Sequence, residues 1–279
     1  MIELTAFNFS TLLVFGVFIG LLGSALGVGG GIFMVPFLVL ALKIPIHQAV
    51  AASLVAIVAT SSAVAAVNVE RGLANIRLGI TLEVTTALGS IAGALIASRI
   101  PGDVVRLMFA LMLFPVSVMM FLKGRSSLKK TAPRPPVSVG KDSAFDSAFF
   151  DHALAEHTPY KVRNIAPASF ISFFAGSLSG LLGIGGGIVQ VPVMNLLCGV
   201  PMKAAAATSN FIIGVSAAAS AYVYFRKELI PFELTAVIVA GVLIGSFIGI
   251  YALYKARAEK LQIAFSALAL LVAVKMLVG

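Results

Sequence analysis

Two stretches of this chain share one pattern of glycine and proline. Residues 20–36 read GLLGSALGVGGGIFMVP, and residues 176–192 read GSLSGLLGIGGGIVQVP. The offset between them is 156 positions, and the same offset pairs Gly93 with Gly249 without a gap. Self-similarity at a fixed offset marks a duplicated unit, so we predict that the chain consists of two copies of one unit.

The composition places both units in a membrane. Hydrophobic residues make up 59% of the 279 residues and charged residues 11%, against about 45–50% and about 25% in soluble domains. The mean hydropathy is +1.05. A soluble enzyme, a disordered chain and a coiled coil are therefore excluded. The net charge of +9 does not indicate nucleic acid, because the basic residues lie between apolar segments and in one linker. The single cysteine, Cys198, excludes a disulfide framework within the chain.

Apolar segments predict where the helices lie. Five precede a polar linker and five follow it, at about 9–26, 31–43, 47–68, 76–98 and 104–122, and at about 167–182, 187–199, 203–225, 233–254 and 261–278. The segment 32–43 would cover about 18 Å as a helix, whereas a bilayer core is about 30 Å thick. We therefore expect each unit to begin with two short helices joined by a glycine break inside the membrane, followed by three transmembrane helices.

Lysine and arginine positions predict the orientation. The linker, residues 123–166, is rich in both and is placed in the cytoplasm between a first repeat at 9–122 and a second at 167–279. Inverted repeats also place Lys203 and the basic cluster at 255–260 inside, whereas parallel repeats place them outside. The predicted fold is an all-α polytopic membrane protein, with two inverted-topology repeats and both termini extracytoplasmic.

The glycine breaks are the predicted substrate site. Unpaired backbone at membrane depth is tolerated only where protein or a water-filled cavity covers it. The helices that begin at the breaks have unpartnered N–H groups and the positive end of the helix dipole, so two such starts meeting near mid-membrane would bind an anion. The alternative is two tight turns with no ligand. The break glycines are Gly27, Gly29, Gly30, Gly31, Gly183, Gly185, Gly186 and Gly187.

Polar side chains near the breaks are candidates to complete this site, because amides and hydroxyls donate hydrogen bonds to oxyanions. They are Ser53, Thr60, Ser61 and Ser62 in the first repeat, and Gln190, Asn195, Thr208, Ser209 and Asn210 in the second. Each taken alone has the simpler interpretation of a helix–helix hydrogen bond. Gln190 and Asn210 replace Met34 and Leu54 of the first repeat, so the expected site is asymmetric.

Three further residues inside the predicted spans are singled out. Glu83 is an acid well inside a span, which indicates a function such as proton coupling. Its alternative is that it lies two turns from Ile76 and reaches water or an arginine. Pro36 and Pro192 follow the breaks and each remove one backbone donor. They either kink their helices or free carbonyl groups along a path.

The linker begins basic and proline-containing and then shows an amphipathic pattern. Phe145, Ala148 and Phe149 share one helical face, so we predict a solvated or membrane-surface helix there. The alternative of a metal site rests on Asp151, His152, Glu156 and His157 and is disfavoured. No metal and no other cofactor is predicted.

The two glycine motifs resemble the doubled signature of the sulfite exporter TauE/SafE permeases, also called the 4-toluene sulfonate uptake permease family. The second motif, which continues through Pro201 and residues 207–210, is the closer match. The resemblance covers the chain except for the linker, which is longer than the family leads one to expect. It implies an inner-membrane transporter of small sulfur-containing anions that works without ATP hydrolysis. The glycine motifs, their prolines, Thr208, Ser209 and Asn210 are the residues it carries over.

The sequence thus predicts a secondary transporter rather than an enzyme. It would export sulfite, sulfoacetate or another organosulfonate by alternating access around the breaks. Two alternatives stay open, namely an importer of another small carboxylate or sulfur compound, and a membrane assembly or signalling protein that works through its linker. The expected partners are a small anion and the lipid bilayer, not nucleic acid. Stripes of small residues permit a homodimer without requiring one.

Overall fold

A computed structural model describes residues 6–26, 29–127, 143–151, 156–255, 270 and 273–276. The helices of the first half are α1 (Ala6–Leu26), α2 (Gly31–Leu40), α3 (Ile46–Glu70), α4 (Ile76–Ala97) and α5 (Gly102–Ser127). Those of the second half are α6 (Ile165–Leu182), α7 (Gly187–Pro192), the π-helix η1 (Val193–Leu197), α8 (Met202–Phe225) and α9 (Phe232–Lys255). The predicted all-α fold is confirmed, and the last predicted span, 261–278, lies mostly outside the described residues.

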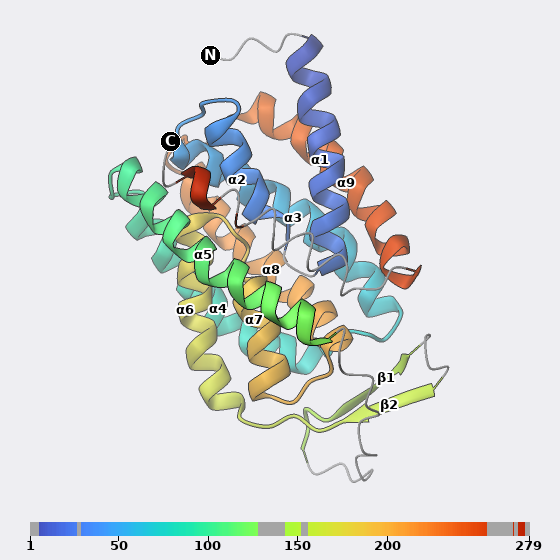
Figure 1. Cartoon of the computed structure of the whole chain (residues 1–279). Coiled ribbons are helices and arrows are strands. Elements are labelled where there is room, and N and C mark those ends of the chain that lie inside the picture. The colour runs from blue at the N-terminus through green and yellow to red at the C-terminus, as the bar shows by residue number, and fades with distance from the viewer. Residues whose placement is uncertain are drawn as a thin grey trace.

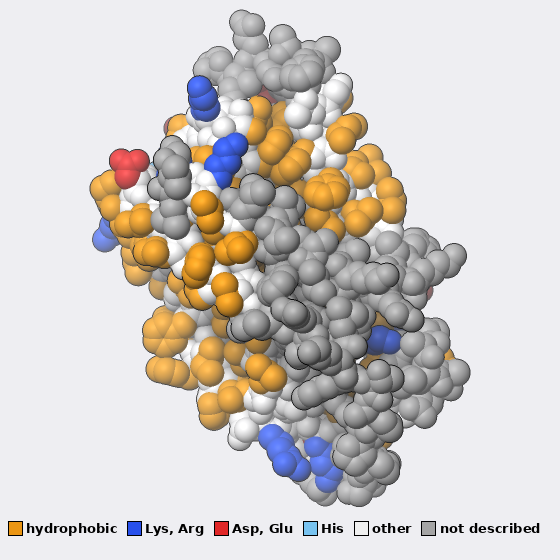
Figure 2. Space-filling model, viewed as in Figure 1, with side chains coloured by type: hydrophobic (Ala, Val, Ile, Leu, Met, Phe, Trp, Pro, Cys, Tyr) orange, Lys and Arg blue, Asp and Glu red, His pale blue; other side chains and the backbone are white. Residues whose placement is uncertain are grey.

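The outer faces of the helices match a membrane environment. Within the described residues, α3, α4, α6, α8 and α9 are long and apolar enough to cross a membrane. Large apolar side chains on these helices are exposed, among them Ile80, Val84, Leu88, Phe170 and Phe247. Figure 2 shows apolar side chains over the middle of the molecule and several lysine and arginine side chains near its upper and lower ends. Such extensive apolar exposure is atypical of soluble proteins, so lipid is the natural covering.

Two helix pairs join the halves of the chain. α1 packs along α9, and α4 packs along α6 (Figure 1). Glycines allow this approach, since a Cβ atom on Gly245 would overlap the carbonyl oxygen of Val17, and one on Gly93 that of Ser177. By the 156-residue offset, α1 corresponds to α6 and α4 corresponds to α9. The pair of α1 with α9 is therefore equivalent to the pair of α6 with α4.

Both of these helix pairs run parallel. Along α1 and α9, Gly16 faces Gly241 and, further on, Leu21 faces Gly249. In the same way Thr86 of α4 faces Gly176 of α6, and the next turns of both helices face each other too. The first helix of each half therefore points in the same direction as the fourth helix of the other half.

The corresponding helices α3 and α8 pack against each other at the centre of the bundle in opposite directions. The start of α3 and the end of α8 both reach the end of α6, because Gly183 packs on Val50 while the Tyr224 hydroxyl donates to the Gly180 carbonyl at 3.1 Å. At the other end of the bundle, the backbone N–H of Asn75, just beyond α3, donates to a side-chain hydroxyl at the start of α8 at 2.9 Å.

The linker contains a β-hairpin, so the predicted amphipathic helix is wrong. β1 (Ser147–Asp151) pairs antiparallel with β2 (Glu156–Tyr160). Phe149 is buried in one apolar cluster with side chains of α4 and η1. The four-residue spacing from Phe145 to Phe149 that favoured a helix is an even number, so it equally fits the two-residue period of a strand.

Asn75 attaches the hairpin segment to the end of the bundle. Its side-chain oxygen accepts from the Leu78 backbone N–H at 3.1 Å and so caps α4. Its side-chain nitrogen donates to the Phe145 carbonyl at 2.9 Å, and Arg77 donates to the Ala144 carbonyl at 3.1 Å. The hairpin is therefore fixed to the start of α4, at the lower end of the bundle in Figure 1.

Candidate substrate site

Both breaks have a backbone conformation that favours glycine. The φ angles are 77° and 75° at Gly29 and Gly30, and 70°, 86° and 70° at Gly183, Gly185 and Gly186. A side chain is strained in this left-handed region, which glycine adopts freely. The break residues Gly30 and Gly186 directly precede α2 and α7 as N-caps. The predicted break before each short helix is therefore confirmed. Gly27 lies outside the described residues.

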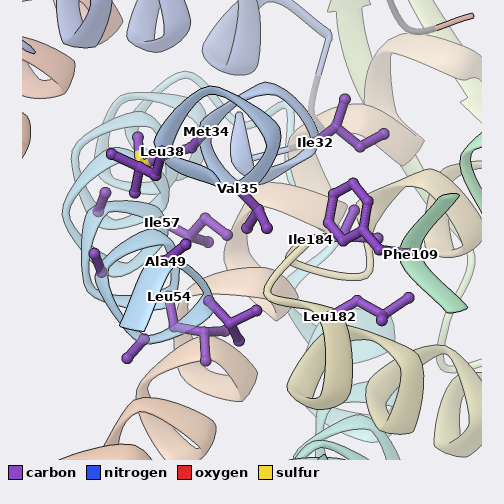
Figure 3. Close-up of a cluster of buried hydrophobic side chains, with 14 of the residues drawn as sticks. Ile32, Met34, Val35, Leu38, Ala49, Leu54, Ile57, Phe109, Leu182 and Ile184 are labelled. Atoms are coloured by element: carbon purple, nitrogen blue, oxygen red, sulfur yellow. The ribbon is translucent and has the colours of Figure 1, made fainter. Parts of the chain in front are cut away.

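The two breaks meet at the midpoints of α3 and α8. A Cβ atom on Gly29 would lie 3.2 Å from Ile57 Cγ2 and 3.3 Å from Ile213 Cγ2. A Cβ atom on Gly185 would lie 3.0 Å from Ile213 Cγ2 and 3.3 Å from Ile57 Cδ1. Both isoleucines are fully buried. Figure 3 draws Ile57 in one apolar cluster with Ile184 of the second break. The breaks thus come together around two apolar side chains.

The start of α2 is closely packed in this conformation. Ser53 Oγ donates to the Gly183 carbonyl at 2.8 Å, which ties the first repeat to the second break. A Cβ atom on Gly31 would overlap that same carbonyl oxygen and lie 2.9 Å from Ser53 Oγ. Since even a methyl group does not fit there, this conformation has no room for an anion beside Gly31.

Open space lies next to this junction, in a cleft of about 520 Å³ between α3 and α8. Its lining includes Val58 and Gly214, which directly follow Ile57 and Ile213 in the chain. It also reaches Val69 in the last turn of α3, on the side where the hairpin docks. The remaining lining residues are Ser61, Ser62, Ala65, Ala66, Asn210, Phe211, Val215 and Ala218. The cleft therefore leads from the hairpin side toward the breaks.

Asn210 is the polar side chain of the cleft with unused hydrogen-bonding capacity. It is 3% exposed and lines the cleft, and its side chain makes no hydrogen bond among the described residues. A buried amide normally has partners, so its two N–H donors and its oxygen are available to a ligand in the cleft. Ser61 Oγ already donates to the Ile57 carbonyl at 2.5 Å, but its lone pairs and the exposed Ser62 hydroxyl also border this space.

Gln190 makes packing contacts outside the cleft. It is fully buried, its side-chain nitrogen donates to Thr86 Oγ1 at 2.7 Å, and its oxygen accepts from Ser172 Oγ at 3.2 Å. These two bonds attach α7 to α4 and α6. The simpler interpretation of a helix–helix hydrogen bond therefore describes Gln190.

Four other predicted polar residues also lie outside the cleft lining. Asn195 donates to the Val200 carbonyl at 2.8 Å, where η1 ends. Thr208 donates to the Ala204 carbonyl at 2.7 Å and accepts from Asn75. Thr60 donates to the carbonyl one turn earlier in its own helix. Ser209 is fully buried and absent from the cleft lining.

The prolines mark a difference between the two short helices. α2 continues as an α-helix through Pro36 to Leu40. In the second half, α7 ends at Pro192 and the chain continues as the π-helix η1. Proline removes the donor that an α-helix needs at that point, and π-helical turns often occur near functional sites. The two halves of the site are thus not identical.

Glu83 is buried without a partner. Its side chain is 7% exposed, and neither carboxylate oxygen makes a hydrogen bond within the described part of the chain. The alternative in which Glu83 reaches water or an arginine does not fit this burial. Among the described residues, no group of three or more possible metal ligands occurs, and His152 of the metal alternative lies outside them.

A polytopic helical bundle in which a broken helix pair from each half meets beside a cleft that contains Asn210 and two serines is typical of a membrane transporter. The family comparison names the kind: residues 12–276 match the family described as Sulfite exporter TauE/SafE, and the chain belongs to that family. It is accordingly a membrane transporter and not an enzyme.

Curated relatives of this chain carry similar descriptions. It is 29% identical to the probable membrane transporter protein YunE of Bacillus subtilis, over 75% of each chain. It is 26% identical to a probable membrane transporter protein of Xylella fastidiosa, over 82% of this chain and 80% of the relative. Sulfite exporter TauE/SafE family protein 1 of Arabidopsis thaliana is 37% identical over 30% of this chain and 20% of its own length. No solved structure matches the chain.

Proposed function

We propose that this protein exports sulfite, sulfoacetate or another small organosulfonate across the inner membrane. The observation that carries the proposal is the Asn210 amide in the cleft beside the two glycine breaks, which has no hydrogen-bond partner within the described part of the chain. An oxyanion accepts hydrogen bonds from amide and hydroxyl groups, so Asn210 and Ser62 suit a sulfonate or sulfite without a cationic side chain. The family description, which names sulfite export, supports the same substrate class.

In this proposal, the site opens to one side of the membrane at a time, as is typical of transporters built from two repeats of inverted topology. The opposite directions of α3 and α8, which correspond by the repeat offset, support the inversion. With the hairpin side in the cytoplasm, as the lysine and arginine positions favour, the cleft is open to the cytoplasm. Ile57 and Ile213 then separate the bound anion from the far side. Rocking one repeat against the other would close the cleft and expose the breaks to that far side.

Uptake of labelled sulfite into proteoliposomes that contain the purified protein tests the proposal. Unlabelled sulfoacetate, sulfate, phosphate and acetate serve as competitors. We expect saturable flux that sulfoacetate suppresses and acetate does not. Competition by acetate instead would favour a carboxylate substrate, and absence of flux from folded protein would contradict the substrate class.

The variant Asn210→Leu tests the site itself. A hydrogen bond to a charged group contributes about 1.5–3 kcal/mol, so its loss should weaken sulfite affinity by about 10- to 100-fold. Asn195→Leu is the matched control, because Asn195 bonds to the Val200 carbonyl away from the cleft. Equal losses in the two variants would remove the assignment to the cleft while leaving the substrate class untouched.

A further inference from the structure

Glu83 is an ionisable group with an unusual environment in the interior of the bundle. It lies on the face of α4 that also contains Gly79, Thr86 and Ser90, and all four are buried. Ser90 Oγ donates to the Ser216 carbonyl of α8, so this face packs on α8 as well as on α6. Neither Glu83 oxygen has a hydrogen-bond partner among the described residues. A carboxylate in this position would lack both water and a counter-charge, which costs several kcal/mol.

Among the described residues, the elements packed against α4 supply no compensating charge at this position. The hairpin places Tyr160 in the apolar cluster around Leu78 and Leu82, and burial raises the pKa of this tyrosine, so its hydroxyl is uncharged. The sequences of α6, α7 and η1 contain no titratable side chain. On α8, Lys203 and Tyr222 are exposed, and the Tyr224 hydroxyl is bound to the Gly180 carbonyl at the far end of the bundle. On α4 itself, Arg77 is exposed and reaches the Ala144 carbonyl of the linker. The uncharged carboxylic acid is thus the form that this packing favours.

Glu83 lies between two contacts that connect α4 to the substrate site. One turn before it, Gly79 packs on Phe211, and Phe211 also lines the cleft. About one turn after it, Thr86 accepts the hydrogen bond from Gln190 of α7, the helix that begins at the second break. A shift of α7 or α8 relative to α4 therefore changes what surrounds Glu83.

We propose that Glu83 is a proton-binding site that couples transport to the proton gradient. In the packed conformation the carboxyl group holds its proton. When α4 separates from α8 or α7, water reaches the group, its O–H bond breaks, and the proton passes to that water while the carboxylate is hydrated. One proton then moves for each conformational cycle. The proposal of a proton site is based on the burial and packing of Glu83. Only the identity of the anion that is transported with the proton rests on the proposed function.

Infrared difference spectroscopy tests the proton site without any transported substrate. The wild-type protein should show the carbonyl stretch of a protonated carboxylic acid that disappears as the pH is raised. Glu83→Gln should lack this band, whereas Glu70→Gln should keep it, because Glu70 is exposed at the end of α3. The glutamine side chain has the size of the neutral acid, so folding is expected to survive. A band of unchanged intensity in Glu83→Gln would overturn the proposal.

Accumulation of labelled sulfite under an imposed pH gradient tests the coupling. One coupled proton allows about tenfold accumulation per unit of pH difference, since one unit corresponds to a tenfold ratio of proton activity. We expect the wild type and Glu70→Gln to respond in this way, and any flux left in Glu83→Gln to ignore the gradient. An unchanged response in Glu83→Gln, or a wild type indifferent to the gradient, would refute coupling through Glu83.

The two failures are distinguishable. If the wild type moves no sulfite but shows the titrating band that Glu83→Gln lacks, sulfite is wrong as the substrate and the proton site stands. If sulfite moves and the band is still present in Glu83→Gln, the substrate stands and the proton site is wrong. If Glu83→Gln moves no sulfite at all, the infrared comparison alone decides.

Discussion

Ile57 and Ile213 occupy corresponding positions in the two repeats, and each of them contacts both glycine breaks. A Cβ atom on Gly29 or on Gly185 would lie 3.0–3.3 Å from these two side chains, which is closer than an ordinary van der Waals contact. The two side chains therefore fill the space between the breaks at the centre of the molecule, directly beside the cleft. In the proposed mechanism, an anion that passes from the cleft to the far side displaces these two side chains.

Truncating one of these side chains should make the closed conformation leak. In Ile213→Ala we expect a non-saturable sulfite flux in addition to the saturable one, and a stability loss of about 2–5 kcal/mol from the cavity. The measurement is efflux from loaded proteoliposomes. Ile212→Ala is the matched control, since Ile212 is equally buried on α8 but packs in the cluster around Leu78 and Met194. A similar leak through Ile212→Ala would mean that loosened packing alone causes it.

Gly185→Ala should impair transport through both backbone strain and crowding. A side chain in the left-handed region costs about 1–2 kcal/mol, and the new Cβ atom would press on Ile213 Cγ2 at 3.0 Å. Gly185→Leu should abolish flux while the protein still inserts into the membrane. Gly72→Ala controls for strain alone, because Gly72 has a φ of 64° and no atom within 4 Å of its Cβ position. Equal loss of flux in Gly72→Ala would contradict a role for the contact.

Gln190→Leu should lower stability rather than substrate affinity. The change removes the bonds to Thr86 and Ser172, and leaving these buried hydroxyls with fewer partners costs about 1–3 kcal/mol. A lower melting temperature in detergent with an unchanged sulfite affinity is the expected pair of results. The opposite pair, an intact melting temperature with weaker sulfite binding, would place Gln190 in the substrate site after all.

Phe149→Ala should detach the hairpin without stopping transport. Removing a buried phenylalanine costs about 3–5 kcal/mol, and Phe149 is 4% exposed in its cluster with α4 and η1. Limited proteolysis of the linker should therefore become faster. The neighbouring Phe150 points to the other face of the strand, stacks edge-on against His157 and provides the control Phe150→Ala. Loss of flux on detachment alone would revive the hypothesis that the linker is the working part.

The sequence predicted the helices and the breaks because both are encoded by local patterns. Hydropathy marks the spans, and glycine adopts the left-handed backbone at Gly29 and Gly185 without strain. The polar site residues were less predictable, since position in the chain does not say which face of a helix borders a cleft. Thr208 and Asn210 are two residues apart, so they point in nearly opposite directions from α8. One of them packs against Asn75, and the other lines the cleft.

Two other features could not be read from the sequence. Ile57 and Ile213 are ordinary apolar residues in apolar helices, and their importance arises only because the breaks fold against them. The hairpin was missed because the spacing of Phe145 and Phe149 fits either period, and the contact of Asn75 with the Phe145 carbonyl joins segments far apart in the chain.

The packing of α1 on α9 and of α4 on α6 joins the two halves of the chain, and this has a consequence for how such a chain folds and arises. The glycine face of α1 has no partner until α9 has been synthesised, so neither half completes its packing alone. In a lipid environment this delay is tolerable, because small residues facing acyl chains expose no unpaired polar group. An ancestral single unit would have met the same requirement by packing its first helix on the fourth helix of a second copy. The chain thus contains, within one polypeptide, the two equivalent contacts that such a pair of units would form.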